Sequence, residues 1–169
     1  MIELNTKKNI KVSVPESLEE DDTPKFSIND DRIREYYIEH GYVVIKNLIN
    51  YITCEEFKDI WDREVKTSKS FIYRQASAKP EKHVFNSNKW VMNPILNLQS
   101  LDPNKFKKLR EKSLELFSDQ KLCKIFKTLF KDKPKIVQSM YFEGNSETWE
   151  HQDTYYLDSN VLGTMAGAW

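Results

Sequence analysis

Apolar residues recur with helical spacing most clearly between positions 120 and 130 of the chain. They occupy positions i, i+3, i+4, i+7 and i+8, as in an amphipathic helix that packs one face on a core: Leu122, Ile125, Phe126, Leu129 and Phe130. A row of lysines lies on the opposite face: Lys121, Lys124, Lys127 and Lys131. We predict that this row faces solvent; the alternative is a face that contacts phosphate groups or nucleic acid.

Two further helices are predicted from capping and breaking residues. One covers residues 32–39 and ends at Gly41, since glycine readily adopts the left-handed conformation that closes a helix. The other opens at Thr53, which forms a capping box with Glu56, and runs to about Val65. A short helix followed by a longer one therefore precedes the middle of the chain.

Short β-branched and apolar runs predict strands on either side of an irregular region. The run YVVI predicts a strand at residues 42–45, and residues 135–143 predict another, followed by a turn at Gly144. Residues 71–90 show no clear periodicity, which favours a loop. Asp102, which precedes a proline, is the expected start of one more helix.

Composition indicates a single soluble globular domain. The chain has 169 residues, of which 39% are hydrophobic, and this length fits one domain. Residues 1–25 are polar and acidic and are predicted to form a flexible lead-in, so the domain covers residues 26–169. Lys plus Arg and Asp plus Glu both number 26, and this zero net charge argues against nucleic acid as a partner.

The cysteines and the amino terminus favour a cytoplasmic location. Cys54 and Cys123 are isolated, with neither metal-ligand spacing nor a disulfide framework, as expected in a reducing compartment. The opening sequence MIELNTKKNIKVSV lacks the apolar centre of a signal peptide. No apolar run approaches the length of a membrane span, so no membrane partner is expected.

The candidate chemistry lies in the sequence WEHQDTYYLDS, which begins at Trp149 and contains His151 and Asp153. On a β-strand, residues two apart point to the same face, so this pair would place an imidazole and a carboxylate in one cavity. These are two of the three ligands of the 2-His-1-carboxylate triad that binds non-haem Fe(II). The alternative is an ordinary His-x-Asp sequence in a solvent-facing loop.

The segment from Lys135, KIVQSMYFEGNSETWEHQDTYYLDSNVLGTMAGAW, resembles the centre of the phytanoyl-CoA dioxygenase family. Members are similar to one another in an apolar strand, a polar turn, a HQD triplet and a later strand that ends in Ala-Trp. A looser similarity in EHGYVVIKNLI and the Thr-Cys-Glu-Glu that follows extends the resemblance to roughly residues 28–169. The resemblance implies an α+β fold: a double-stranded β-helix, or cupin-like jelly roll, with amino-terminal helices.

The resemblance also implies an activity and a set of site residues. His151 and Asp153 would bind Fe(II), and the enzyme would hydroxylate a small organic substrate with molecular oxygen while converting 2-oxoglutarate to succinate. Met140 and Trp169 match positions that contact 2-oxoglutarate, and Gln138 would offer its amide to the same cosubstrate. The carboxylate of Asp153 favours hydroxylation, because halogenating relatives have a small residue there that leaves room for chloride.

Two features of the family have no match in this chain. Members continue beyond the position of Trp169 and carry there a second metal-binding histidine and an arginine that pairs with 2-oxoglutarate. His151 is the last histidine here, and His40 and His83 lie upstream, at positions that do not match the third ligand. We therefore expect an amino-terminal fragment, inactive alone, that lacks the later jelly-roll strands. The alternative is a jelly-roll binding or regulatory module with an incomplete, inactive metal site.

Overall fold

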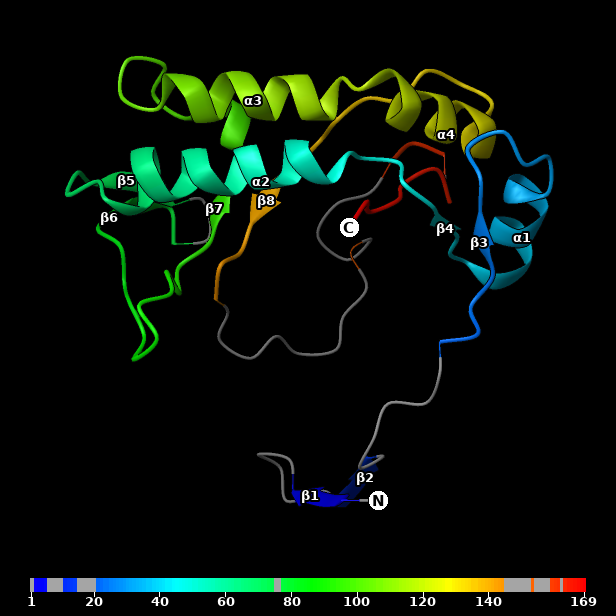
Figure 1. Cartoon of the computed structure of the whole chain (residues 1–169), viewed down its shortest axis with the longest axis horizontal. Helices are drawn as coiled ribbons and strands as arrows, with labels where there is room; N and C mark the ends of the chain where they lie inside the picture. Colours follow the sequence, from blue (N-terminus) through cyan, green and yellow to red (C-terminus); the bar gives the residue numbers. More distant parts are fainter. Residues whose placement is uncertain are drawn as a thin grey trace. The chain divides into compact units, whose positions relative to one another are not determined.

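A computed structural model describes most of the chain and divides it into two compact units. The units are Met1–Lys46 and Asn47–Trp169, each with its own internal packing (Figure 1). The described residues are 2–5, 11–14, 21–74, 77–144, 153, 159–161 and 163–169.

The first unit begins with a two-stranded antiparallel sheet. Strand β1 (Ile2–Asn5) pairs with β2 (Lys11–Val14), and Ile2 lies opposite Val14 in the register. Both strands fall within residues 1–25, so the predicted lead-in contains regular structure.

Helix α1 (Ile33–His40) confirms the first predicted helix. Gly41 follows it with a φ of 77°, and its N–H bonds to the Tyr37 carbonyl, which closes the helix in the left-handed conformation. The neighbouring strands, β3 (Lys25–Phe26) and β4 (Val44–Ile45), pair in parallel. The predicted strand at residues 42–45 is thus confirmed only in its second half.

The second unit begins with helix α2 (Tyr51–Ile60). Its N-cap is Asn50, whose side-chain oxygen accepts a hydrogen bond from the Ile52 N–H at 3.0 Å. The predicted capping box of Thr53 and Glu56 is therefore wrong, since both residues lie inside the helix that Asn50 starts.

Helix α2 continues into a π-helix of six residues, η1 (Trp61–Lys66). The wider turn of a π-helix is rare and often occurs at functional sites. Trp61 and Val65 both enter the core, at 2% and 0% exposure. The sequence predicted a regular helix through this region, because its apolar spacing does not distinguish the two forms.

Helix α3 (Lys107–Phe117) packs beside α2 and η1 (Figure 1). Its N-cap position is Phe106, which has no side-chain acceptor for the free N–H groups of the first turn. Glu64 of η1 replaces it: its carboxylate accepts from the Lys108 N–H at 3.3 Å and the Leu109 N–H at 2.8 Å.

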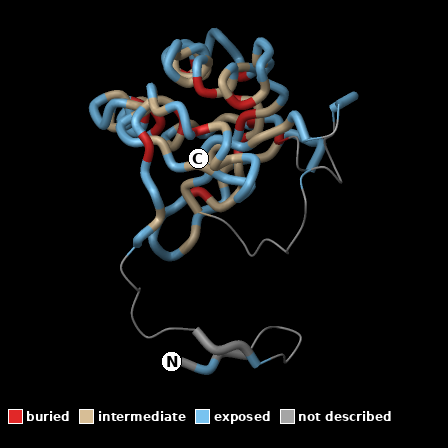
Figure 2. Tube along the Cα trace, turned by 90° about the vertical axis from the view of Figure 1, so that its right-hand side faces the viewer, coloured by how far each residue is buried: buried red, intermediate tan, exposed pale blue. Residues whose placement is uncertain are grey.

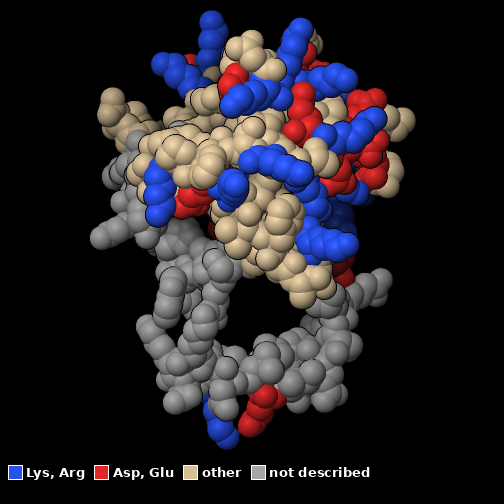
Figure 3. All heavy atoms as spheres, turned by 90° about the vertical axis from the view of Figure 1, so that its left-hand side faces the viewer, with Lys and Arg blue, Asp and Glu red and all other residues tan. Residues whose placement is uncertain are grey.

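Helix α4 (Gln120–Phe130) confirms the amphipathic prediction. Asp119 caps it by accepting from two backbone N–H groups of its first turn, and Ile125 and Leu129 are buried. The lysine row is exposed, as predicted: Lys121, Lys124, Lys127 and Lys131. On the face drawn in Figure 3, basic side chains are interspersed with acidic ones. No described helix is long and apolar enough to cross a bilayer.

The strands of the second unit form two antiparallel pairs. Strand β5 (Ile72–Arg74) pairs with β6 (Lys79–Glu81), and β7 (Ile95–Leu96) pairs with β8 (Met140–Tyr141). A short 3₁₀ helix, η2 (Leu98–Ser100), follows β7.

These strands correct two predictions. Residues 71–90, predicted to be an irregular loop, contain β5 and β6. The strand predicted for residues 135–143 is present only as β8, because residues 135–139 do not continue the ladder with β7. The described strands do not close into a barrel, and the jelly roll implied by the family resemblance stays a prediction.

The core of the second unit lies where α2, η1, α3 and the β7–β8 pair meet. Trp61 is the largest of its fully buried side chains. Most buried apolar residues of the chain belong to this one cluster, and Figure 2 shows buried positions in red. Its members are Phe57, Trp61, Val65, Ile72, Val91, Ile95, Leu98, Leu101, Phe106 and Leu109.

The capping of α3 by Glu64 is open to a direct test. Glu64→Ala should lower the free energy of unfolding by about 1–2 kcal/mol, because two helix N–H groups lose a charged acceptor. Urea unfolding followed by circular dichroism measures the change. Glu111→Ala is the matched control, since Glu111 forms only an exposed ion pair with Lys107 at 3.9 Å, and should cost less than about 0.5 kcal/mol. Equal losses in both variants would contradict the capping role.

Candidate functional site

The structure describes one of the two predicted iron ligands. His151 lies outside the described residues. Asp153 is described and exposed. Within the described part of the chain, no group of three or more His, Cys, Asp or Glu residues could hold a metal ion.

The three residues predicted to contact 2-oxoglutarate differ in their exposure to solvent. Met140 lies on β8 opposite Leu96 and is 44% exposed. Gln138 is half-buried and lies two residues before Met140, outside the strand. The alternation of side chains along a strand therefore does not determine whether Gln138 and Met140 share a face. Trp169 is fully exposed. The structure therefore places Gln138 and Met140 on one segment and does not show these residues gathered in a pocket.

The segment that carries Gln138 is fixed by the residue after it. Ser139 is 8% exposed, and its hydroxyl donates to the Gln99 side-chain oxygen at 2.7 Å while accepting from the Leu98 N–H at 3.0 Å. Its carbonyl accepts from the Asn97 N–H at 2.6 Å. These bonds connect the entry to β8 with the start of η2 and hold it in place without strand pairing.

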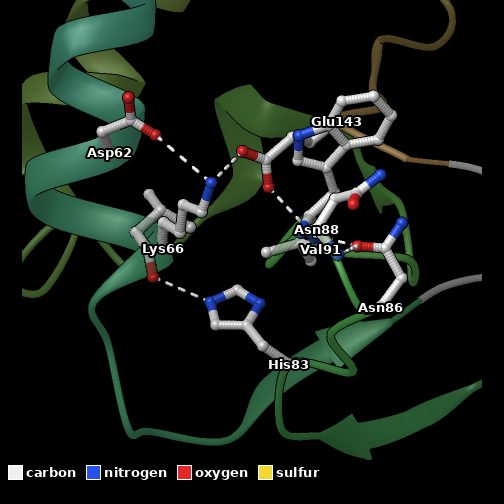
Figure 4. Close-up of polar contacts among 9 residues, drawn as sticks. Asp62, Lys66, His83, Asn86, Asn88, Val91 and Glu143 are labelled. Carbon is white, nitrogen blue, oxygen red and sulfur yellow. Dashed lines mark hydrogen bonds and ion pairs between the residues drawn. The ribbon is translucent and has the colours of Figure 1, made fainter.

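The end of β8 is fixed by a second polar cluster, in which Glu143 is the central residue (Figure 4). One carboxylate oxygen pairs with the Lys66 ammonium of η1, and the other accepts from the Val91 N–H at 2.7 Å. Lys66 also lies 3.8 Å from the Asp62 carboxylate. The side chains of Lys66 and Glu143 are only 25% and 15% exposed, which strengthens their attraction relative to a surface pair.

His83 lies beside this cluster (Figure 4) and bridges two elements, η1 and β5. Its Nε2 lies 2.7 Å from the Val65 carbonyl oxygen of η1, and its Nδ1 lies 2.9 Å from Nη2 of Arg74 on β5. Both ring nitrogens are therefore engaged within the protein. His83 has no nitrogen left for a metal ion in this arrangement, in agreement with its mismatch to the third ligand position.

Arg74 is a buried guanidinium without a bonded carboxylate among the described residues. It is 1% exposed, and its Nη1 donates to the Asn93 and Pro94 carbonyls at 3.0 and 3.3 Å. Its Nε has no hydrogen-bond partner in the described part of the chain. Burial lowers the pKa of Arg74, and the more distant Glu81 opposes this.

An aromatic stack lies on the inner side of β8. The rings of Trp61 and Tyr141 are 4.2 Å apart, and Phe57 is 5.6 Å from Tyr141. Burial, with a smaller contribution from Glu143, raises the pKa of Tyr141 to about 12. The phenol therefore stays protonated near neutral pH.

His40, the remaining histidine, lies in the first unit. It is exposed, and its ring lies 4.2 Å from that of Tyr36. Its surroundings are aromatic rather than those of a metal ligand set.

The second unit also contains a small cleft beside β5 and the end of β7. Its volume is about 170 Å³, below the several hundred Å³ usual for small-molecule sites. Neither Met140 nor Gln138 lines it. The lining residues are Phe71, Ile72, Tyr73, Leu96, Asn97, Ser100, Leu101, Asp102, Lys105 and Phe106.

Sequence reasoning missed both the Lys66–Glu143 pair and the Arg74–His83 contact. These residues come from η1, β5, the segment after β6 and the end of β8, so no local motif connects them. The contacts of Ser139 and Glu143 fix the residues before and after β8, and so the position of the strand. Comparisons with protein-family models, curated proteins and solved structures found no match to this chain.

The Lys66–Glu143 pair can be tested by a double-mutant cycle. Lys66→Met and Glu143→Gln should show a coupling energy of about 1–2 kcal/mol in urea unfolding, because the pair is largely shielded from water. Glu143→Gln keeps an acceptor for the Val91 N–H, so the cycle isolates the charge pair. The exposed pair of Lys58 and Glu55 is the control and should give less than about 0.5 kcal/mol. A coupling no larger than the control would show that the pair does not stabilise the fold.

Proposed function

We propose that this chain is part of an Fe(II)- and 2-oxoglutarate-dependent dioxygenase of the phytanoyl-CoA dioxygenase type. The observation that carries the proposal is the His151-x-Asp153 pair within WEHQDTYYLDS, which follows the apolar and polar sequence KIVQSMYFEGNSET. The proposed substrate is a small organic molecule that the enzyme hydroxylates in the cytoplasm.

The donor chemistry of the pair fits the metal. A neutral imidazole and a carboxylate are the ligand types that non-haem Fe(II) sites combine, and they leave positions open for cosubstrate and oxygen. His151 and Asp153 would hold the iron, and Asp153 would supply the anionic protein ligand. Bound iron would supply the oxidation of a carbon–hydrogen bond, coupled to decarboxylation of 2-oxoglutarate.

The other residues would bind and enclose the cosubstrate. The amide of Gln138 would hydrogen-bond to 2-oxoglutarate, while Met140 and Trp169 would pack against it and exclude water. The exposed thioether of Met140 leaves room for such packing. A second histidine must complete the ligand set, and His83 does not provide it, because both of its ring nitrogens are engaged.

The proposal predicts that Asp153→Ala abolishes succinate release from 2-oxoglutarate in the natural full-length protein. The loss should reach several orders of magnitude, because iron would lose its anionic ligand. Asp153→Glu retains the charge but displaces it by about 1 Å, and misplacement of that size can cost roughly a hundredfold in rate. Succinate is measured with excess Fe(II) and, in parallel, Fe(II) affinity is measured by titration.

Lys127→Ala on the exposed face of α4 is the control and should leave both readouts unchanged. Near-normal succinate release by Asp153→Ala would remove the pair from the metal site, and the dioxygenase proposal with it. Absence of Fe(II) binding and of succinate in the wild-type protein would favour the alternative, a jelly-roll module with an inactive site.

A further inference from the structure

The two contacts of His83 determine where its ring carries a proton. A guanidinium nitrogen only donates and a carbonyl oxygen only accepts. Nδ1 must therefore accept from Arg74 Nη2 at 2.9 Å, and Nε2 must donate to the Val65 carbonyl at 2.7 Å. The imidazole is neutral in this arrangement. A second proton would bind Nδ1 and point directly at the guanidinium.

Arg74 cannot adapt easily to that change. It is 1% exposed, its other bonds are to the Asn93 and Pro94 carbonyls, and none of the described carboxylates bonds to it. Protonated His83 would be a second cation at hydrogen-bond distance from the buried guanidinium at a partly buried site, where like charges repel more strongly than in water. The Arg74–His83 bond would therefore break.

The groups around His83 include both signs of charge. Burial is the largest influence and lowers the pKa of His83 from its usual 6.5; the Val65 carbonyl opposes this, Arg74 adds to it and Glu143 opposes it. Glu143 is already paired with Lys66. The remaining neighbours are Asp62 beside Lys66, Glu81 near Arg74, and the rings of Trp61 and Phe85.

His83 joins the segment of residues 82–90 to the rest of the unit. This segment follows β6 and folds back on the chain: the Val84 N–H donates to the Asn93 side chain at 3.0 Å, and the Val84 carbonyl accepts from the Met92 N–H at 2.7 Å. His83 alone of these residues contacts both η1 and β5 through its side chain.

We infer that the Arg74–His83 contact is a pH-sensitive closure of the 82–90 segment. Protonation of His83 breaks its contact with β5 and thereby loosens the segment, although Nε2 can still donate to the Val65 carbonyl. Val91 beyond the segment remains buried and bonded to Glu143. The inference does not depend on the proposed iron chemistry.

The direction of the pH dependence follows from linkage. The pKa of His83 is lower in the closed state than the usual 6.5 of an exposed histidine, so the open state binds the extra proton. Closure is complete above pH 6.5 and is lost as the pH falls through 6.5 towards the lower value. At about pH 5.5 the opening equilibrium should have risen by at most about tenfold, the limit for one proton over one pH unit.

Amide hydrogen exchange of the wild-type chain, corrected for intrinsic rates, tests the inference between about pH 7.5 and pH 5.5. The amides of Val84 and Met92 should lose protection, by up to about tenfold, while those of Val91 and of Ile125 in α4 should not change. An unchanged Val84, or an equal loss at all four amides, would overturn local release of the segment.

His83→Gln is the matched variant, since its amide offers an acceptor to Arg74 and a donor to Val65 but does not titrate. Its protection should be independent of pH, and the same loss in this variant would overturn the role of His83. A ¹⁵N spectrum of the wild-type ring provides a second measurement that does not require the variant to fold. It should show the Nε2–H form with a pKa below 6.5, and the opposite tautomer or a pKa above 6.5 would also overturn the inference.

Discussion

The second unit depends on the six residues of the π-helix η1, since α2, α3, β8 and the segment after β6 all contact them. The Trp61 ring stacks on Tyr141, Glu64 accepts from the first turn of α3, and the Val65 carbonyl accepts from His83. The Lys66 ammonium pairs with Glu143 at the end of β8. A π-helix is rarer than the α-helix that it continues, and these contacts from several directions stabilise it.

Burial makes the polar contacts of this unit more specific than surface contacts. In a weakly hydrated interior, a polar group without a partner costs more than its hydrogen bond contributes. Glu143 satisfies this requirement with an ammonium and a backbone N–H, and Ser139 with a backbone N–H and a side-chain amide. Each group admits few alternative arrangements, so the residues before and after β8 have defined positions although the strand itself is only two residues long.

The sequence predicted what is encoded locally. Helix α4 follows from the spacing of its apolar residues, and the end of α1 follows from Gly41. Helix starts were less predictable, because more than one nearby residue could serve: Asn50 rather than Thr53 begins α2, and α3 begins after a turn in which the Phe106 N–H bonds to Asp102.

In the candidate site, too, the sequence indicates the local features but not the contacts between distant residues. The His151-x-Asp153 pair can be recognised in the sequence because its members are only two positions apart. Its role remains a prediction. The contact between Lys66 and Glu143 joins residues 77 positions apart, and the contact between Arg74 and His83 depends on how β5 and β6 pair. No periodicity or local motif indicates such contacts, since they exist only after the elements have packed together.

The capping of α3 by Glu64 also has a consequence for the order of folding. A helix of 11 residues is marginal in water by itself, and this one has no acceptor of its own for its first N–H groups. Its amino-terminal turn becomes stable only when a carboxylate 45 positions earlier in the chain reaches the Leu109 N–H. Formation of α3 is thereby linked to formation of η1, so we expect the first turn of α3 to become ordered no earlier than η1.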